Sequence, residues 1–328
     1  MVRVSKAVRA MSGLHGKMAD VCGVGLNATD TVIRLPHFPA FNSKVRVESA
    51  EISCGGQVAS AMVACARWGL RTRYAGKIGD DAAGELQRSE FARAGVESHL
   101  IRVKSCASQG SFILLDKKSG ERTILWQRDD RMELRPRELR REWVTNARAL
   151  LVDGHDTAAA AQAARWAREA RIPVTADLDN LYPGVEKLLQ NVDYAITSKE
   201  FPARLTGEKN LPKALRQIQR EYKNLVVGAT LGSDGVIAWD GSEFNYRPAF
   251  RVKVMDTTGA GDIFHAAFAY AQLARRDLPA MLEFSCAAAA LNCTAVGARG
   301  GIAPLAAIRN LMRTGPRHRN AFGRRRFA

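Results

Sequence analysis

The sequence predicts an α/β domain built on a mostly parallel sheet with helices on both faces. Between residues 149 and 240, segments typical of strands and helices alternate, and this pattern is typical of parallel sheets. The length of 328 residues, with an ordinary 46% of hydrophobic residues, is sufficient for one large core. Two β-rich stretches, within 31–53 and 108–127, interrupt the alternation, and we expect them to form a small flap outside the main sheet.

The first part of the chain begins with a short apolar strand at 20–25. Asn27 and Asp30 follow at its carboxyl end, where open α/β sheets bind ligands. Gly23 and Gly25 are followed by no third glycine and no helix, which excludes a dinucleotide-binding fingerprint. The next expected elements are a helix at 57–68, a strand at 72–78 and a helix that is capped by Asp80 or Asp81 and ends at Gly95.

The flap is expected from short β-like pieces. The first stretch includes residues 44–47, and the second forms a hairpin of 108–116 and 122–127 joined by a turn at 117–120. Polar residues on the second stretch are candidates for ligand contacts, and a solvated strand face explains them equally well. These candidates are Gln109, Ser111 and Arg128.

The second half of the chain supplies the regular alternation. We expect strands at 149–154, 172–178, 192–198, 224–231 and 236–240, and helices at 157–170, 211–222 and 286–294. The carboxyl ends of neighbouring parallel strands meet at one edge of the sheet, so polar side chains there are candidates for a ligand site. They are His155 and Asp156 after one strand, and Asp177 and Asp179 at the next. For the two last aspartates, a helix cap or a solvated turn is the alternative.

The net charge of +16 is concentrated at the two ends of the chain. Residues 1–19 carry four basic residues and residues 313–328 carry six, with no acidic residue in either segment, so these ends supply ten of the sixteen charges. We expect a basic extension at 1–19, one domain at 20–314 and a basic tail at 315–328. No basic motif interleaved with aromatic residues is present, so nucleic-acid binding is not expected.

The remaining composition indicates a cytoplasmic protein. No apolar run approaches the roughly 20 residues that a membrane-spanning helix needs, so no membrane association is expected. The beginning of the chain lacks the long apolar segment of a signal peptide. The six cysteines form no CxxC pair, which favours reduced thiols over disulfides or zinc.

The most informative stretch is Asp256-Thr257-Thr258-Gly259-Ala260-Gly261-Asp262. We expect a strand at 250–255 before it and a helix at 262–275 after it. A strand, a turn with two glycines and a helix place free backbone N–H groups at a helix N-terminus, which favours bound anions. A carboxylate at such a site repels phosphate. Asp262 therefore either caps the helix or accepts a proton from a hydroxyl group that attacks phosphorus.

This heptad resembles the signature of the ribokinase-like (PfkB) carbohydrate kinases. The resemblance implies a three-layer α/β/α sandwich with a mostly parallel sheet and a small β-sheet lid, which the two β-rich stretches would form. It also implies that Asp262 is the catalytic base. The backbone amides of Gly259, Ala260 and Gly261 would form the anion hole for the transferred phosphoryl group. The match favours catalysis over a helix cap.

Further stretches resemble motifs of the same family. Gly55-Gly56 matches a glycine pair beside the sugar, although Ser60 stands near the position of a usual Asn. The turn from Thr230 to Gly235 resembles a motif that contacts nucleotide phosphates. Glu200 matches the Glu of an Asn-x-x-Glu motif that organises magnesium-bound water, with Thr197 in place of the Asn. The implied candidates are Asn27, Asp30, Gly55, Gly56, Gln57, Ser60, Gln109 and Asp177 for the sugar, Thr230, Gly232, Gly235 and Asn292 for the nucleotide, and Glu200, Asp256 and Thr258 for metal ions.

The resemblance implies transfer of the γ-phosphoryl group of ATP to a hydroxyl of a small carbohydrate. Mg²⁺ would bridge the phosphates, and in many members K⁺ binds between Asp256, the Thr258 carbonyl and the turn at 296–301. A homodimer formed through the lid is also implied. The alternatives are a nucleoside kinase of the same fold and a non-catalytic sugar-binding regulator, although a regulator is expected to lose the base.

Overall fold

Two sheets organise the computed structural model, which describes residues 18–118 and 122–319. The basic segments 1–17 and 320–328 and the end of the predicted hairpin turn, 119–121, lie outside the described residues. The larger sheet has nine strands, all parallel to their neighbours except for two antiparallel strands at one edge. From that edge to the other they are β13 (Phe244–Arg247), β12 (Val236–Trp239), β11 (Val226–Thr230), β10 (Tyr194–Thr197), β9 (Val174–Leu178), β8 (Leu150–Asp153), β1 (Val21–Val24), β4 (Thr72–Gly79) and β5 (Glu97–Val103).

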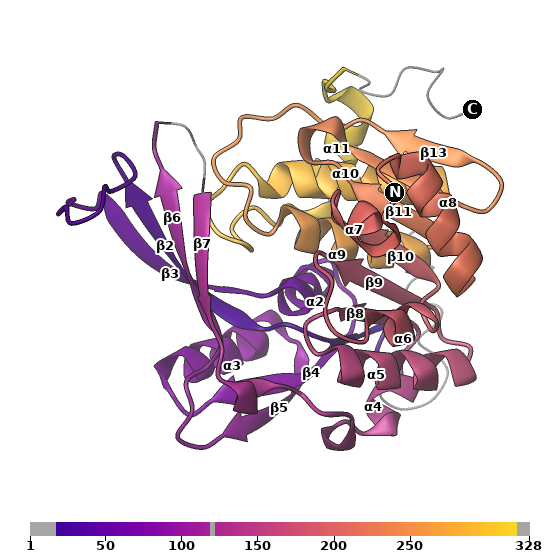
Figure 1. The fold of residues 1–328 in the computed structure, drawn as a ribbon, viewed down its shortest axis with the longest axis horizontal. Helices are drawn as coiled ribbons and strands as arrows, with labels where there is room; N and C mark the ends of the chain where they lie inside the picture. Colours follow the sequence, from indigo (N-terminus) through magenta and orange to yellow (C-terminus); the bar gives the residue numbers. More distant parts are fainter. Residues whose placement is uncertain (1–17, 119–121, 320–328) are drawn as a thin grey trace.

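The smaller sheet lies outside the larger one, at the left of the view in Figure 1. Its strands are, in order, β3 (Ser49–Gly55), β2 (Ala28–Leu35), β6 (Gly110–Asp116) and β7 (Arg122–Gln127). The central pair is parallel and the two outer pairs are antiparallel. Both predicted β-rich stretches therefore join one small sheet, which confirms the flap.

Helices cover both faces of the larger sheet and give the three-layer α/β/α sandwich (Figure 1). One buried cluster lies under α2 (Gln57–Arg67), α3 (Ala82–Ala94), α9 (Ala260–Leu273), α10 (Leu278–Asn292) and α11 (Leu305–Thr314). The cluster on the opposite face lies under α4 (Arg141–Thr145), α5 (Thr157–Glu169), α6 (Val185–Leu189), α7 (Phe201–Thr206) and α8 (Leu211–Tyr222). Three short 3₁₀ helices are η1 (Asp130–Met132), η2 (Pro136–Glu138) and η3 (Gly232–Asp234).

The helix α9 occupies the centre of its layer because it packs against both α2 and α10. All three helices are rich in alanine, which lets their backbones approach closely. Every residue of α9 from Ile263 to Ala271 is buried. The core therefore holds the start of α9 in one fixed position, close to the carboxyl ends of the strands of the larger sheet.

The order of strands creates a crevice beside β1. The chain continues from β1 to β4 and β5 on one side, and returns later to β8 and β9 on the other side. Side chains and loops at the carboxyl ends of the strands diverge at such a switch point, and ligands bind there in open α/β sheets.

Several expected elements are wrong or were missed. Residues 44–47 form no strand, and residues 251–255 pair with no strand of either sheet. The main-chain N–H groups of Met255 and Asp256 instead donate to the carbonyl of Cys293. The helix α10 begins at Leu278, eight residues before the expected start, where Asp277 caps it. The strands β5 and β13 were not expected. Among residues 18–118 and 122–319, no helix is both long and apolar enough to span a membrane.

The first residues of the predicted C-terminal tail pack against the domain. The N–H of Arg251 donates to the carbonyl of Pro316, and the N–H of His318 donates to the carbonyl of Ala249. The guanidinium group of Arg317 lies 3.9 Å from the centre of the Phe250 ring and pairs with Glu283. The domain thus extends past residue 314 to at least residue 318.

We expect Arg317→Ala to lower the free energy of unfolding by about 1–2 kcal/mol, because it removes a partly buried cation–π contact and an ion pair. Arg313→Ala is the matched control, because Arg313 is exposed and hydrogen-bonds to Asn310 on its own helix. Chemical denaturation of both variants checks this. Equal stabilities would show that residues 315–318 contribute nothing to the domain.

Candidate active site

A cavity of about 710 Å³ lies where five strands of the larger sheet end. Five residues at the carboxyl ends of these strands line it. Leu26, His155 and Ser198 follow β1, β8 and β10, whereas Asp177 lies near the end of β9 and Thr230 is the last residue of β11. The small sheet and the start of α9 complete its wall. The large cavity thus lies at the carboxyl ends of the parallel strands, where the sequence predicts a ligand site.

The small sheet presents polar and aromatic side chains to this cavity. Residues paired directly across strands lie on the same face, and Asp30, Ser111 and Trp126 form one such row. The Ser111 hydroxyl donates to Asp30 Oδ1 at 2.6 Å. In the neighbouring row Ile113 and Ile124 also line the cavity. One wall therefore combines a carboxylate, a hydroxyl group and a large ring.

The loop before α9 is fixed by the carboxylate of Asp256. Its Oδ1 accepts hydrogen bonds from the Thr258 N–H at 2.8 Å and the Thr258 hydroxyl at 2.7 Å. Its Oδ2 accepts from the N–H of Gly297 at 2.9 Å. One side chain thus ties the loop at 256–259 to the loop at 296–300.

Gly259 brings these two loops into direct contact. Its φ of 74° is in the left-handed region, and a Cβ atom at this position would clash with the carbonyl oxygen of Ala298. The helix α9 starts at the next residue, and the N-cap position carries no side-chain hydrogen bond. The N–H of Ala260 donates to the carbonyl of Thr257 at 3.3 Å. Within the described residues the N–H groups of Gly259 and Gly261 have no such main-chain acceptor, so they are available at the cavity, as an anion site requires.

Asp262 lies in the first turn of α9, partly buried in the cavity wall. Burial and the nearby carboxylates of Asp177 and Asp30 together raise the pKa of Asp262 to about 7, although the cations of His265 and Arg299 act in the opposite direction. The carboxylate makes no capping hydrogen bond at the start of α9, so the geometry does not support the helix-cap alternative. A carboxyl group of this pKa can exchange a proton near neutral pH.

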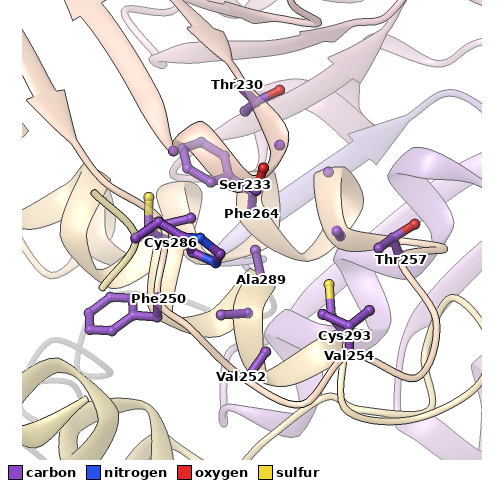
Figure 2. Close-up of a pocket in the computed structure, with 17 residues that line it drawn as sticks. Thr230, Ser233, Phe250, Val252, Val254, Thr257, Phe264, Cys286, Ala289 and Cys293 are labelled. Atoms are coloured by element: carbon purple, nitrogen blue, oxygen red, sulfur yellow. The ribbon is translucent and has the colours of Figure 1, made fainter. Parts of the chain in front are cut away.

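A second, mostly apolar pocket of about 240 Å³ adjoins the first (Figure 2). Figure 2 shows Phe250, Val252 and Val254 along one edge, and Thr230 and Ser233 along the opposite edge. The two pockets share part of their walls, which places the start of α9 between them. The shared residues are Thr230, Thr257, Ala260 and Gly261.

Most of the predicted site residues line one of these two pockets. In the large cavity they are Asp30, Gly56, Gln57, Gln109, Asp177, Thr230, Thr258, Gly259, Ala260, Gly261 and Asp262. In the small pocket they are Gly232 and Gly235, together with the shared Thr230, Ala260 and Gly261. These residues come from six separate parts of the sequence, at 30, 56–57, 109, 177, 230–235 and 258–262.

Three predicted sugar-site residues do not line the cavity. The Asn27 side chain points to Gln87, whose Oε1 accepts its hydrogen bond at 2.9 Å. The Ser60 hydroxyl and the Gly55 carbonyl both accept hydrogen bonds from Arg299, at 3.1 and 2.8 Å. The Asn27 Nδ2, the Ser60 hydroxyl and the Gly55 carbonyl therefore have partners within the protein, whereas the buried Oδ1 of Asn27 has no hydrogen-bond partner among the described residues.

Three further predicted residues lie outside both pockets. Asn292 is buried, and its Nδ2 donates to the carbonyls of Thr258 and Ala298, so it supports the loops and does not reach a base. The Asp256 carboxylate supports the same loops. Glu200 is exposed at the N-cap position of α7. It lies two residues after Ser198, which lines the large cavity.

Sequence reasoning missed four residues around the cavity. Arg122 of β7 lines it and donates to the Thr257 hydroxyl, and Tyr182 lines it beside His155. Arg299 is buried under the glycine pair, and His265 is buried behind Asp262. The sequence marks these four residues only as charged or polar side chains within stretches that are otherwise apolar or rich in glycine.

Comparisons with known proteins agree with this geometry. The family model described as "pfkB family carbohydrate kinase" matches residues 18–304. The ATP-dependent ribose-1-phosphate kinase of Halopiger xanaduensis is 27% identical over 286 residues, which cover 86% of this chain and 94% of that protein. The crystal structure of a putative ribokinase from Agrobacterium tumefaciens has a TM-score of 0.84 at 27% identity, covering 90% of this chain and 98% of the other.

The structure of Arabidopsis thaliana ribokinase, complexed with ribose and ATP, has a TM-score of 0.75 at 22% identity and covers 91% of this chain and all of the other. These similarities confirm the ribokinase-like fold that the sequence indicates.

We expect Gly259→Ala to lower the free energy of unfolding by about 1–3 kcal/mol, because the new Cβ meets the Ala298 carbonyl in a left-handed conformation. Gly261→Ala is the matched control, because a Cβ at residue 261 meets no atom within 4 Å. Thermal unfolding of both variants decides the point. A Gly259→Ala protein as stable as Gly261→Ala would mean that the two loops do not make this contact.

Proposed function

Because the chain belongs to the pfkB family of carbohydrate kinases, we propose that it transfers the γ-phosphoryl group of ATP to a hydroxyl group of a small sugar in the large cavity. One observation carries this proposal. The free N–H groups at the start of α9 and the Asp262 carboxylate lie where the large cavity meets the apolar pocket. A nucleotide in the apolar pocket and a sugar in the cavity would therefore meet at one anion site beside one base.

Each part of the loop has a separate task in this proposal. Asp262 takes the proton of the attacking hydroxyl group as its oxygen forms a bond to the γ-phosphorus, and the bond from this phosphorus to the bridging oxygen of ADP breaks. The amides of Gly259, Ala260 and Gly261 donate to the oxygens of the transferred group. Such donors are already oriented before the reaction, which is why they stabilise the developing charge.

The sugar and the nucleotide would contact different walls. Asp30, Gln57 and Gln109 offer acceptors and donors to sugar hydroxyl groups, with the N–H of Gly56 and the Asp177 carboxylate nearby. The apolar pocket suits the adenine ring, and the turn carrying Thr230, Gly232 and Gly235 suits its phosphates. These assignments follow from the chemistry of the lining, and the Arabidopsis ribokinase of similar fold was solved in complex with ribose and ATP.

Metal ions fit this site to different degrees. Within the described residues no group of three or more acidic, histidine or cysteine side chains is arranged to hold a metal. This suits Mg²⁺, which supplies charge neutralisation while bound mainly to phosphates and water, and Glu200 would hold such a water. K⁺ fits less well, because the Asp256 carboxylate and the Thr258 carbonyl already accept hydrogen bonds from Thr258, Gly297 and Asn292. The proposal includes no step that needs K⁺.

A nucleoside kinase is the second candidate function. Trp126 and Tyr182 line the large cavity, and Trp126 is 71% exposed, so a base could stack on it. An assay of ATP consumption with D-ribose, ribose 1-phosphate and adenosine separates the two functions. We expect turnover with a sugar. Turnover with adenosine alone would favour the nucleoside kinase, and binding without turnover of any compound would favour a regulator.

The small sheet offers a surface for a second copy of the chain. Ile52, Phe112 and Leu125 lie in one row with Thr31 on the face away from the cavity. Their exposed fractions are 66%, 48% and 53%, which is unusual for large apolar side chains in a continuous row. We propose that this row packs against its equivalent in a homodimer, as the family resemblance implies.

We expect Leu125→Glu to convert a dimer to a monomer, because it places charges in the centre of the interface. Leu225→Glu is the matched control. Leu225 is 57% exposed, which is similar to Leu125, but it lies before β11, away from the small sheet. Light scattering coupled to size-exclusion chromatography gives the masses. A wild-type monomer, or a dimer that survives Leu125→Glu, would contradict the proposed interface.

For the catalytic role, we expect Asp262→Asn to lower kcat by about 10²–10⁴-fold, because the amide accepts a proton far less readily than a carboxylate. In the wild type, kcat/KM should rise with pH up to about 7, the pKa of Asp262, since only the ionised carboxylate is a base. This rise should disappear in the variant. Loss of less than about tenfold would show that Asp262 is not the base.

A further inference from the structure

One buried histidine beside Asp262 has no task in the mechanism proposed above. His265 is 2% exposed and follows Asp262 by three residues in α9. Its Nδ1 lies 2.8 Å from the carbonyl oxygen of Gly261 and 3.2 Å from Asp177 Oδ2. Its Nε2 lies 3.1 Å from the carbonyl oxygen of Ile196. Both ring nitrogens therefore face oxygens, and a carbonyl oxygen can only accept a hydrogen bond.

This arrangement matches an imidazolium and not a neutral imidazole. A neutral ring carries one N–H, so the lone pair of its other nitrogen would point at an acceptor. A charged ring donates from both nitrogens, and a buried charge is tolerated where an opposite charge pairs with it. Burial alone lowers the pKa of His265, but the Asp177 carboxylate and the carbonyls of Gly261 and Ile196 raise it to about 9.

The partners of His265 connect three elements of the site. Gly261 belongs to the first turn of α9, Asp177 to the end of β9, and Ile196 to β10. The Asp177 carboxylate lines the large cavity. A hydrogen bond donated by His265 therefore fixes the position of the Asp177 carboxylate relative to the anion site at the start of α9.

We propose that His265 is a positioning residue, charged at neutral pH, that holds Asp177 in the cavity wall and keeps Asp262 able to accept a proton. The second part rests on the proposed role of Asp262. The charged groups that face Asp262 are the carboxylates of Asp177 and Asp30 and the cations of His265 and Arg299. Removing the His265 charge leaves two carboxylates opposed by one cation, so Asp262 binds its proton more tightly.

A second buried histidine provides an internal comparison. His155 Nε2 lies 3.1 Å from the hydroxyl of Tyr182, which can either donate or accept. Burial and the nearby Arg128 together lower the pKa of His155 to about 4. The two histidines beside the cavity should therefore be in opposite states at neutral pH.

The first test is ¹⁵N NMR of the full-length protein labelled at histidine, recorded between pH 6.5 and 8. The His265 resonance is identified by its absence from His265→Asn, or from His265→Gln if the first variant does not fold. We expect two protonated ring nitrogens for His265 and the neutral pattern for His155. A neutral pattern for His265 at pH 7 overturns the proposal. This result is independent of the kinase assignment.

The second test is the pH profile of kcat/KM for His265→Asn, with the sugar that the substrate assay identifies. We expect the acidic limb to move to higher pH by about one unit, which means an approximately tenfold loss at pH 6 and little loss at pH 9. His37→Asn is the control, because His37 is exposed and lines neither of the two pockets. A loss that is uniform across pH, or no loss, overturns the proposed effect on Asp262. If Asp262 is not the base, Asp262→Asn will instead keep most of its turnover, so this failure can be told apart from failure of the role of His265.

Discussion

The carboxylate of Asp256 is the interaction on which the site depends. It joins the loop before α9 to the loop after α10, and no strand pairing connects these segments. Hydrogen bonds to a charged acceptor contribute about 1.5–3 kcal/mol each, more than bonds between neutral groups. The Asn292 amide and the close approach of Gly259 to Ala298 reinforce the same junction. The first N–H groups of α9 therefore have a fixed direction before any ligand binds.

The second constraint is a balance of buried charge around the start of α9. Three carboxylates line the large cavity near one another: those of Asp30 and Asp177, which are buried, and that of Asp262, which is partly buried. Two buried cations, Arg299 and His265, compensate for them from behind. The cations have protein partners, whereas the carboxylates line the cavity. Positive charge thus stabilises the site without occupying the space of a substrate.

Sequence reasoning predicted the layers, the small sheet and the loop before α9, because each has a local pattern of glycines, alternation or strand ends. It missed β5, whose residues are mostly partly exposed and include Glu97, His99 and Arg102, so its apolar pattern is weak. It also assigned a strand to 250–255, where alternation is present but, among the described residues, only Phe250 pairs, in an isolated antiparallel bridge with Arg317. The position of His265 in a network could not be predicted, since its partners are 69 and 88 residues away along the chain. Likewise Ser60 and Asn27 stand at sequence positions expected for sugar contacts, but their side chains bond to Arg299 and Gln87, which are distant in the sequence.

The alternation of side chains in the small sheet has a consequence for how this protein can evolve. Asp30 and Thr31, Ser111 and Phe112, and Leu125 and Trp126 are neighbours in sequence, yet the two members of each pair face opposite sides of the sheet. Substitutions can therefore alter the chemistry of one side while leaving the other intact. A single-residue insertion or deletion within a strand would exchange both sides at once. Divergence in ligand preference should consequently proceed by point substitution, with strand lengths kept constant.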